Sequence, residues 1–187
     1  IYLNGNTDKH EMTIQDSTIR DNRGTCVTAY LSDAVGRHTL TLNKVTITGN
    51  VNEPYQSNRM CTGGGVYIRD GGTVNITDCT IENNEAYIGG GIYVGSTTAQ
   101  LNISGGSISN NRSKNEGGGI CFLRIPDGFS TTKYSDISAS LKIENGTKIC
   151  NNIAMSDGDA DYGSFSSSYY AYGGGIHAIC PNVTIDS

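Results

Sequence analysis

The sequence predicts an all-β chain wound into a right-handed parallel β-helix of about five to six coils with inserted loops. Three observations predict this fold class. A short aliphatic and asparagine template recurs, glycine triplets each precede a β-forming run, and nothing between these features has helical period. The apolar runs consist of Ile, Val, Tyr and Thr, which favour pleated surfaces. Handedness follows from the rule for parallel crossovers.

The recurring template is an aliphatic residue, four residues, Ile, two residues and Asn. Its copies span 14–22, 42–50, 76–84, 103–111 and 143–152, the last with one extra residue, and VTIDS begins a sixth. We expect the aliphatic side chains to point inward and stack. Each final Asn is expected at a corner, in left-handed backbone geometry, with its amide in a ladder from coil to coil. These structural residues are Asn22, Asn50, Asn84, Asn111 and Asn152.

Glycine triplets mark a second recurring corner. They begin at Gly63, Gly89, Gly117 and Gly173, and the first copy has GTC in their place. A side chain at this corner would collide with the coils above and below, whereas glycine tolerates positive φ and close backbone approach. The shortest complete coil is shorter than the roughly 30 residues of a βαβ unit. It suits two or three short strands joined by tight turns.

The composition and net charge of the chain limit the classes of partner that it is expected to bind. The net charge is −5 and the 13 Lys and Arg residues are scattered, which argues against nucleic acid or an anionic membrane as partner. No apolar run approaches the ~20 residues of a membrane span, so we expect no membrane insertion in this segment. The opening IYL resembles the end of a glycine-led strand, and the chain closes in mid-template. We therefore interpret 1–187 as a single β-helix domain, an excerpt of a longer repeat protein.

Six cysteines in a β chain rich in Gly and Asn favour an oxidising, extracellular setting. None forms a CxxC pair, and the histidines are not spaced with them as zinc ligands. We expect buried small hydrophobes plus a few disulfides. The one pairing predicted is Cys26 with Cys61, because both lie just before or within the same segment of successive coils.

The motifs Gly-Gly-Gly-[Ile/Val] and Ile-x-x-Asn resemble the paired GGA[ILV] and FxxN motifs of chlamydial polymorphic outer membrane proteins. More broadly, they resemble the right-handed parallel β-helix repeats of the pectin-lyase-like class, which are common in bacterial surface proteins. The likeness covers almost the whole chain, with a third glycine in place of Ala and Ile in place of Phe. The resemblance implies a solenoid displayed on a cell envelope as an adhesin-like passenger.

Inserted loops are the expected carriers of recognition, because the coils of a solenoid act as scaffold. Residues 51–62 and 153–172 lengthen the gap between Asn and the glycines. The second loop has the Tyr, Ser and Gly of adaptable protein-binding loops and of sugar-stacking surfaces. Surface insertions without a ligand are the alternative. The predicted binding residues are Tyr55, Asp157, Asp159, Asp161, Tyr162, Tyr169, Tyr170 and Tyr172.

The three aspartates of the second loop resemble the start of a calcium loop. The fit is incomplete, because Gly163 falls one place late and position twelve is Ser168 rather than Glu. We therefore predict no cofactor and no metal, with Ca²⁺ at Asp157, Asp159 and Asp161 as the alternative.

An outward slot after the glycines holds Tyr2, Tyr67 and Tyr93, and later coils place Cys121 and His177 there. Stacked in register, the tyrosines would form an exposed aromatic column. Packing of ring on ring explains such a column, and a carbohydrate platform is the sharper hypothesis.

Catalysis would need acids or bases that converge on neighbouring coils. The nearest acid pairs are Asp78 with Glu82 and Asp16 with Asp21, neither supported in the adjacent coil, and His177 is interpreted as isolated. We therefore expect a non-catalytic, monomeric binding module, extracellular or at the cell surface, for a host or neighbouring-cell protein or glycan. The alternative is a polysaccharide lyase or hydrolase of the β-helix class.

Overall fold

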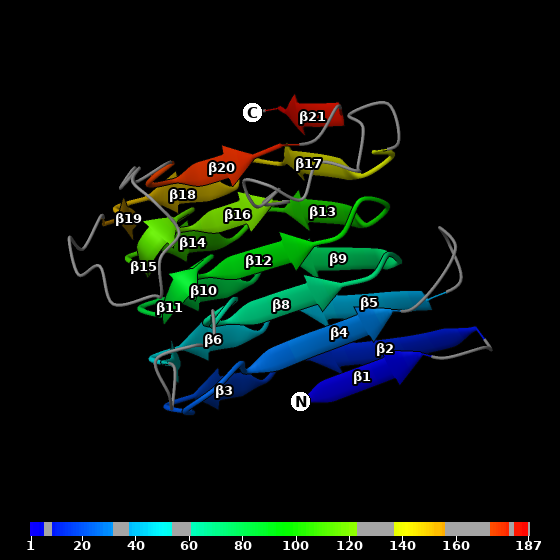
Figure 1. Ribbon diagram of the computed structural model, residues 1–187. Coiled ribbons are helices and arrows are strands. Elements are labelled where there is room, and N and C mark those ends of the chain that lie inside the picture. Colours follow the sequence, from blue (N-terminus) through cyan, green and yellow to red (C-terminus); the bar gives the residue numbers. More distant parts are fainter. Residues whose placement is uncertain are drawn as a thin grey trace, which may run out of the picture.

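The computed structural model describes residues 1–5, 9–31, 38–53, 61–122, 137–155, 173–179 and 182–186. These residues form β-strands and no helix, and every strand pairing among them is parallel. Four sheets result, each a stack of strands from successive coils (Figure 1).

The four sheets are labelled A to D in the order in which the chain visits them. Sheet A contains β1 (Tyr2–Gly5), β4 (Val27–Leu31), β8 (Val66–Arg69), β12 (Ile92–Gly95), β16 (Ile120–Phe122) and β20 (Ile176–Ala178). Sheet B contains β2 (His10–Gln15), β5 (His38–Asn43), β9 (Thr73–Thr77), β13 (Gln100–Ser104), β17 (Ser140–Glu144) and β21 (Asn182–Ile185). Sheet C contains β3 (Thr18–Arg20), β6 (Thr46–Thr48), β10 (Thr80–Glu82), β14 (Ser107–Ser109) and β18 (Lys148–Cys150). Sheet D contains β7 (Val51–Asn52), β11 (Glu85–Ile88), β15 (Arg112–Glu116) and β19 (Ile153–Ala154).

The winding confirms the predicted parallel β-helix. A coil runs through β8, β9, β10 and β11, after which β12 returns to lie beside β8. In Figure 1, sheet A runs from left to right at the front and sheet B runs from right to left behind it. The chain climbs meanwhile from the N-terminus at the bottom to the C-terminus at the top, so the coil is right-handed.

A full coil contains four strands rather than the two or three that were expected. The template copy 76–84 is divided by a bend at Asp78 (φ +51°), which separates β9 from β10. A second bend at Asn83 (φ +55°) separates β10 from β11. Asp and Asn adopt this left-handed conformation at lower cost than other side chains, so single polar residues suffice to turn the chain.

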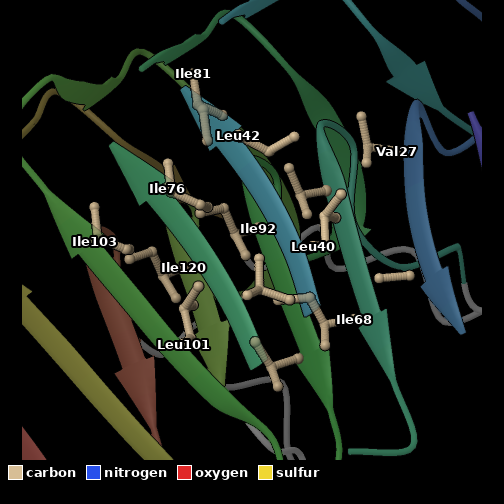
Figure 2. Close-up of a cluster of buried hydrophobic side chains, with 14 of the residues drawn as sticks. Val27, Leu40, Leu42, Ile68, Ile76, Ile81, Ile92, Leu101, Ile103 and Ile120 are labelled. Carbon is tan, nitrogen blue, oxygen red and sulfur yellow. The ribbon is translucent and has the colours of Figure 1, made fainter. Parts of the chain in front are cut away.

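The core consists of aliphatic columns that run along the axis. Ile47, Ile81 and Ile108 pair in register in sheet C and are almost fully buried. Figure 2 shows the buried aliphatic side chains of different sheets extending into one shared interior. Burial of each such side chain is worth about 1.5–3 kcal/mol. The inward positions predicted from the template are therefore confirmed.

The asparagine ladder is confirmed, but its backbone geometry is not as predicted. The Nδ2 of Asn50 donates to the Oδ1 of Asn84 (2.9 Å), and the Nδ2 of Asn84 donates to the Oδ1 of Asn111 (3.0 Å). The same contacts join Asn22 to Asn50 and Asn111 to Asn152. The left-handed residues are the preceding ones, Asp21, Gly49, Asn83, Asn110 and Asn151. The bend is thus made one residue earlier, which leaves each ladder Asn able to turn its amide toward the adjacent coils.

The glycine triplets combine a sharp bend with close stacking, as predicted. Their first residues have positive φ, for example +59° at Gly117. A Cβ added to Gly91 would lie 2.6 Å from the carbonyl oxygen of Gly119 in the next coil. Real Cβ atoms do not approach oxygen this closely, so the glycines let neighbouring coils come together.

No disulfide joins Cys26 to Cys61, and the predicted pairing is wrong. The register of Val27 with Val66 sets Cys26 level with Gly65, the third glycine of the next coil. Cys61 lies ahead of that triplet, where its carbonyl oxygen accepts from the amide of Tyr87. The two cysteines therefore lie on different sides of the glycine bend.

Candidate functional site

The bend at each glycine triplet brings two residues of the chain together. One directly precedes the triplet, and the other lies four places after its first glycine. At Gly117, whose φ is +59°, an added Cβ would overlap the side chain of Cys121. At Gly89, an added Cβ would lie 2.7 Å from the Cβ of Tyr93. The chain thus folds back closely enough to place two side chains together on the outside of the coil.

The outward slot predicted after the glycines exists, and we call it the bend column. Consecutive members pair in register in sheet A: Thr28, Tyr67, Tyr93, Cys121 and His177. Tyr2 pairs with Thr28, so a threonine separates it from the other tyrosines. The predicted column of three stacked tyrosines is therefore a pair, because the first coil supplies Thr28 instead of an aromatic residue.

The outer face of sheet A carries three tyrosine rings and an arginine that together we call the aromatic face: Tyr30, Tyr67, Arg69 and Tyr93. The ring centroids of Tyr67 and Tyr93 lie 5.4 Å apart at 39°. The guanidinium carbon of Arg69 lies 4.9 Å from the centre of the Tyr30 ring, and its Nε lies 3.3 Å from Asp70 Oδ2. Burial raises the pKa of the Tyr67 phenol, which therefore remains a neutral hydrogen-bonding group at physiological pH.

Farther along the bend column, three ligand-type side chains converge into what we call the Glu116–Cys121–His177 cluster. The Oε2 of Glu116 lies 3.3 Å from the Nδ1 of His177, and the Sγ of Cys121 lies 4.0 Å from the same nitrogen. All three donor atoms lie within 4.8 Å of one another. The Cys121 residue is fully buried, and the side chain of Glu116 is 8% exposed.

A β-bulge positions Glu116 in this cluster. The pairing of β11 with β15 shifts after Ala86 and Ser113, so that Ile88 faces Glu116. An apolar position of one coil thus becomes a carboxylate in the next. Bulges re-aim side chains in this way and are common beside functional sites.

The prediction that His177 is isolated is wrong, and Glu116 was not among the predicted site residues. Glu116 directly precedes a triplet, a position that other coils fill with Thr62 and Ile88. Nothing in the template marks this position as special. The usable signal is the triplet itself, because its bend joins the preceding residue to the bend column.

The acid pairs considered from sequence do not converge with a second carboxylate at their own slots. Glu82 pairs with Thr48 and Ser109 in the neighbouring coils. Asp78 follows Thr77, which pairs with Asn43 in one adjacent coil and Ser104 in the other. The residues at the slot of Asp78 in those coils are therefore Lys44 and Gly105. Asp16 and Asp21 likewise lie on the two bends that flank β3, with Lys44 and Gly49 at the matching places of the next coil.

The predicted loop residues lie outside the described part of the chain. They are Tyr55, Asp157, Asp159, Asp161, Tyr162, Tyr169, Tyr170 and Tyr172. The loop hypothesis and the calcium alternative therefore stay predictions.

Comparison with known proteins leaves the function to be argued from this geometry. No family model matches the chain, and no curated protein or solved structure matches it either. Among the described residues, no helix is long and apolar enough to cross a membrane.

Proposed function

We propose that this chain is a non-catalytic, adhesin-like binding module, secreted or displayed at a cell surface. Its β-helix presents the aromatic face and the inserted loops to a host or neighbouring-cell protein or glycan. The observation that carries the proposal is the aromatic face, where the Tyr67 and Tyr93 rings lie against each other at 39° on an outward sheet surface beside Arg69.

The chemistry of this face suits recognition. Tyrosine and arginine are the residue types enriched where protein surfaces bind partners, because they combine apolar area with hydrogen-bonding groups. Sugar rings also stack on aromatic side chains. The rings are held on strands that pair on both sides, and sites on such rigid elements lose little conformational freedom on binding.

The loops would extend this surface. The segment 153–172 is rich in Tyr, Ser and Gly, a composition that suits adaptable contacts. The resemblance of the repeats to those of bacterial surface proteins supports an extracellular location. A monomer is expected.

A polysaccharide lyase or hydrolase is the rival function. A hydrolase of this class needs two carboxylates about 5–10 Å apart across the scissile bond. The acid pairs considered from sequence have Thr, Ser, Lys or Gly at the neighbouring slots. The neighbouring slots therefore offer no further carboxylate to support a catalytic site at these pairs.

The test is a binding screen of the whole chain against immobilised glycans and host surface proteins. The double variant Tyr67→Ala/Tyr93→Ala should weaken binding of a ligand that contacts this face by roughly 5- to 150-fold, since each ring contact is worth about 0.5–1.5 kcal/mol. The matched variant Tyr67→Phe/Tyr93→Phe keeps both rings and should retain most of the affinity. Thr41→Ala, on the outer face of sheet B, serves as the remote control.

A third variant tests the loop. Residues 156–171 are replaced by a short Gly-Ser linker, and the same ligands are measured. Weaker binding would assign part of the recognition to this loop. Binding that is unchanged in both the alanine variant and the loop variant, or release of products from acidic polysaccharides, would contradict the proposed function.

A further inference from the structure

The Glu116–Cys121–His177 cluster assembles three different metal-ligand types from three strands. Glu116 ends β15, Cys121 lies in β16 and His177 lies in β20, so the donors come from three successive coils. Cys121 and His177 face each other because they pair in register, and the bend at Gly117 brings Glu116 to them. The backbone of the solenoid therefore fixes the positions of all three.

The spacing of the donor atoms approaches that around one shared ion. Zinc binds thiolate sulfur at about 2.3 Å and imidazole nitrogen or carboxylate oxygen at roughly 2.0–2.2 Å. In a tetrahedron these bond lengths set nitrogen and oxygen about 3.3 Å apart, and sulfur and nitrogen about 3.6 Å apart. The cluster has 3.3 Å between Glu116 Oε2 and His177 Nδ1, and 4.0 Å between Cys121 Sγ and His177 Nδ1. Cys121 Sγ would have to move a few tenths of an ångström toward His177, and up to about 1.2 Å toward Glu116, which lies within 4.8 Å of it.

Both short separations end on the same ring nitrogen, and this distinguishes a metal site from a catalytic triad. In a triad that relays a proton through the imidazole, the nucleophile and the acid contact opposite ring nitrogens. Here Cys121 and Glu116 both approach Nδ1. That arrangement suits convergence on an ion and leaves Nε2 to carry the ring proton.

Charge balance also favours a divalent cation. A buried carboxylate is costly unless a positive charge compensates it, and Glu116 is one of the few buried charged residues of the described chain. A divalent ion balances the carboxylate together with a Cys121 thiolate, whose proton is released on binding.

We propose that Glu116 Oε2, Cys121 Sγ and His177 Nδ1 bind a zinc ion. Thiolate, imidazole and carboxylate are its donor types, and three protein ligands leave a fourth position for water or another ligand. The ion would join the consecutive strands β15 and β16 to β20, which pairs with β16 one coil farther along the chain. This inference is independent of the proposed binding function, and it is tested by metal binding alone.

The test uses the whole chain, stripped with a chelator and titrated with Co²⁺ as a spectroscopic substitute for zinc. We expect one equivalent to bind with a sulfur-to-cobalt charge-transfer band in the near ultraviolet, and Zn²⁺ to displace it. Cys121→Ser should abolish the band, and Glu116→Gln and His177→Gln should each weaken binding at least tenfold. Cys150→Ser removes an exposed cysteine in sheet C and should change neither the band nor the affinity.

Folding is checked by far-ultraviolet circular dichroism, so that loss of the metal is separated from loss of the fold. His177→Gln is less apt to disturb the fold than Glu116→Gln, because the side chain of His177 is less buried than that of Glu116. Absence of the charge-transfer band in the wild-type chain would overturn the proposal. So would an unchanged band and stoichiometry in Cys121→Ser, since the sulfur ligand would then lie elsewhere.

Discussion

Asn84 shows how single residues tie the coils together. Its Nδ2 donates to Asn111 Oδ1 (3.0 Å) and to the carbonyl oxygen of Ile47 (2.9 Å). Its Oδ1 accepts from both the side chain and the backbone amide of Asn50. With 1% of its surface exposed, it has little access to water that could replace these partners. Loss of the amide would leave several buried polar groups unsatisfied.

The first prediction compares the middle of the ladder with its end. Asn84→Ala should lower the free energy of unfolding by about 3 kcal/mol or more, because each unsatisfied buried group costs about 1–3 kcal/mol. Asn22→Ala, at the exposed end of the ladder, should cost about 1 kcal/mol. Urea denaturation of the two variants measures the difference. Equal losses would show that the ladder is not a source of stability.

The second prediction concerns alkaline pH. Burial raises the pKa of the Cys26 and Cys79 thiols above 9.0, and it also raises the pKa of the Tyr67 phenol above 10.0. A pKa raised in the folded state contributes stability below the unfolded pKa, and this stability is lost as pH rises through the folded value. The urea midpoint under reducing conditions should therefore fall steadily above about pH 9. The variant Cys26→Ala/Cys79→Ala should show a shallower fall, and an identical slope would argue against the thiols.

Elements in this fold are short because bends of one to a few residues bound them, such as Asp78 alone or Gly105 with Gly106. The template predicted the columns of sheets B and C, since Ile recurs there at a fixed interval. It did not predict sheet D, whose strands β7, β11 and β15 share no side-chain pattern. These strands form because the coil before them is already in register, which a local sequence pattern cannot show. Glu116 was not predicted for the same reason, because its position depends on the register between coils rather than on a local sequence pattern.

The third prediction separates the two uses of glycine. Gly91→Ala should destabilise the chain by several kcal/mol, because a Cβ would meet the backbone of the next coil at 2.6 Å. Gly146→Ala, at a turn with φ +67° and open space around the added atom, should cost about 1–2 kcal/mol from backbone strain alone. Thermal or urea unfolding compares them. A mild Gly91→Ala would mean that coils are not closely stacked at the triplets.

The molecule as a whole is a one-dimensional stack in which each coil contacts only its neighbours. Stability in such proteins is shared between adjacent repeats, and terminal repeats have one partner fewer. The burial of the columns reflects this, since Ile81 is 0% exposed in the middle whereas Ile185 in β21 is 65% exposed. The sequence predicted this architecture because stacking requires the repeat itself. The inserted loops and the Glu116–Cys121–His177 cluster follow from departures from the repeat.

The fourth prediction follows from this arrangement. Backbone amides of β10 and β14 should exchange with deuterium far more slowly than those of β21, because opening the middle of the stack breaks two interfaces. Mass spectrometry of the exchanged chain, with peptides that cover both regions, measures the difference. Uniform protection along the axis would indicate a single cooperative unit instead.

The central claim, that successive coils stack in register, is tested most directly by distances along one column. Spin labels introduced as non-canonical residues at Thr39 and, in turn, at Gln100, Ser140 and Asn182 lie two, three and four coils apart in sheet B. With ~4.8 Å between strands, electron paramagnetic resonance should give separations of about 10, 14 and 19 Å. Separations that do not increase in this order would contradict the stacked coil.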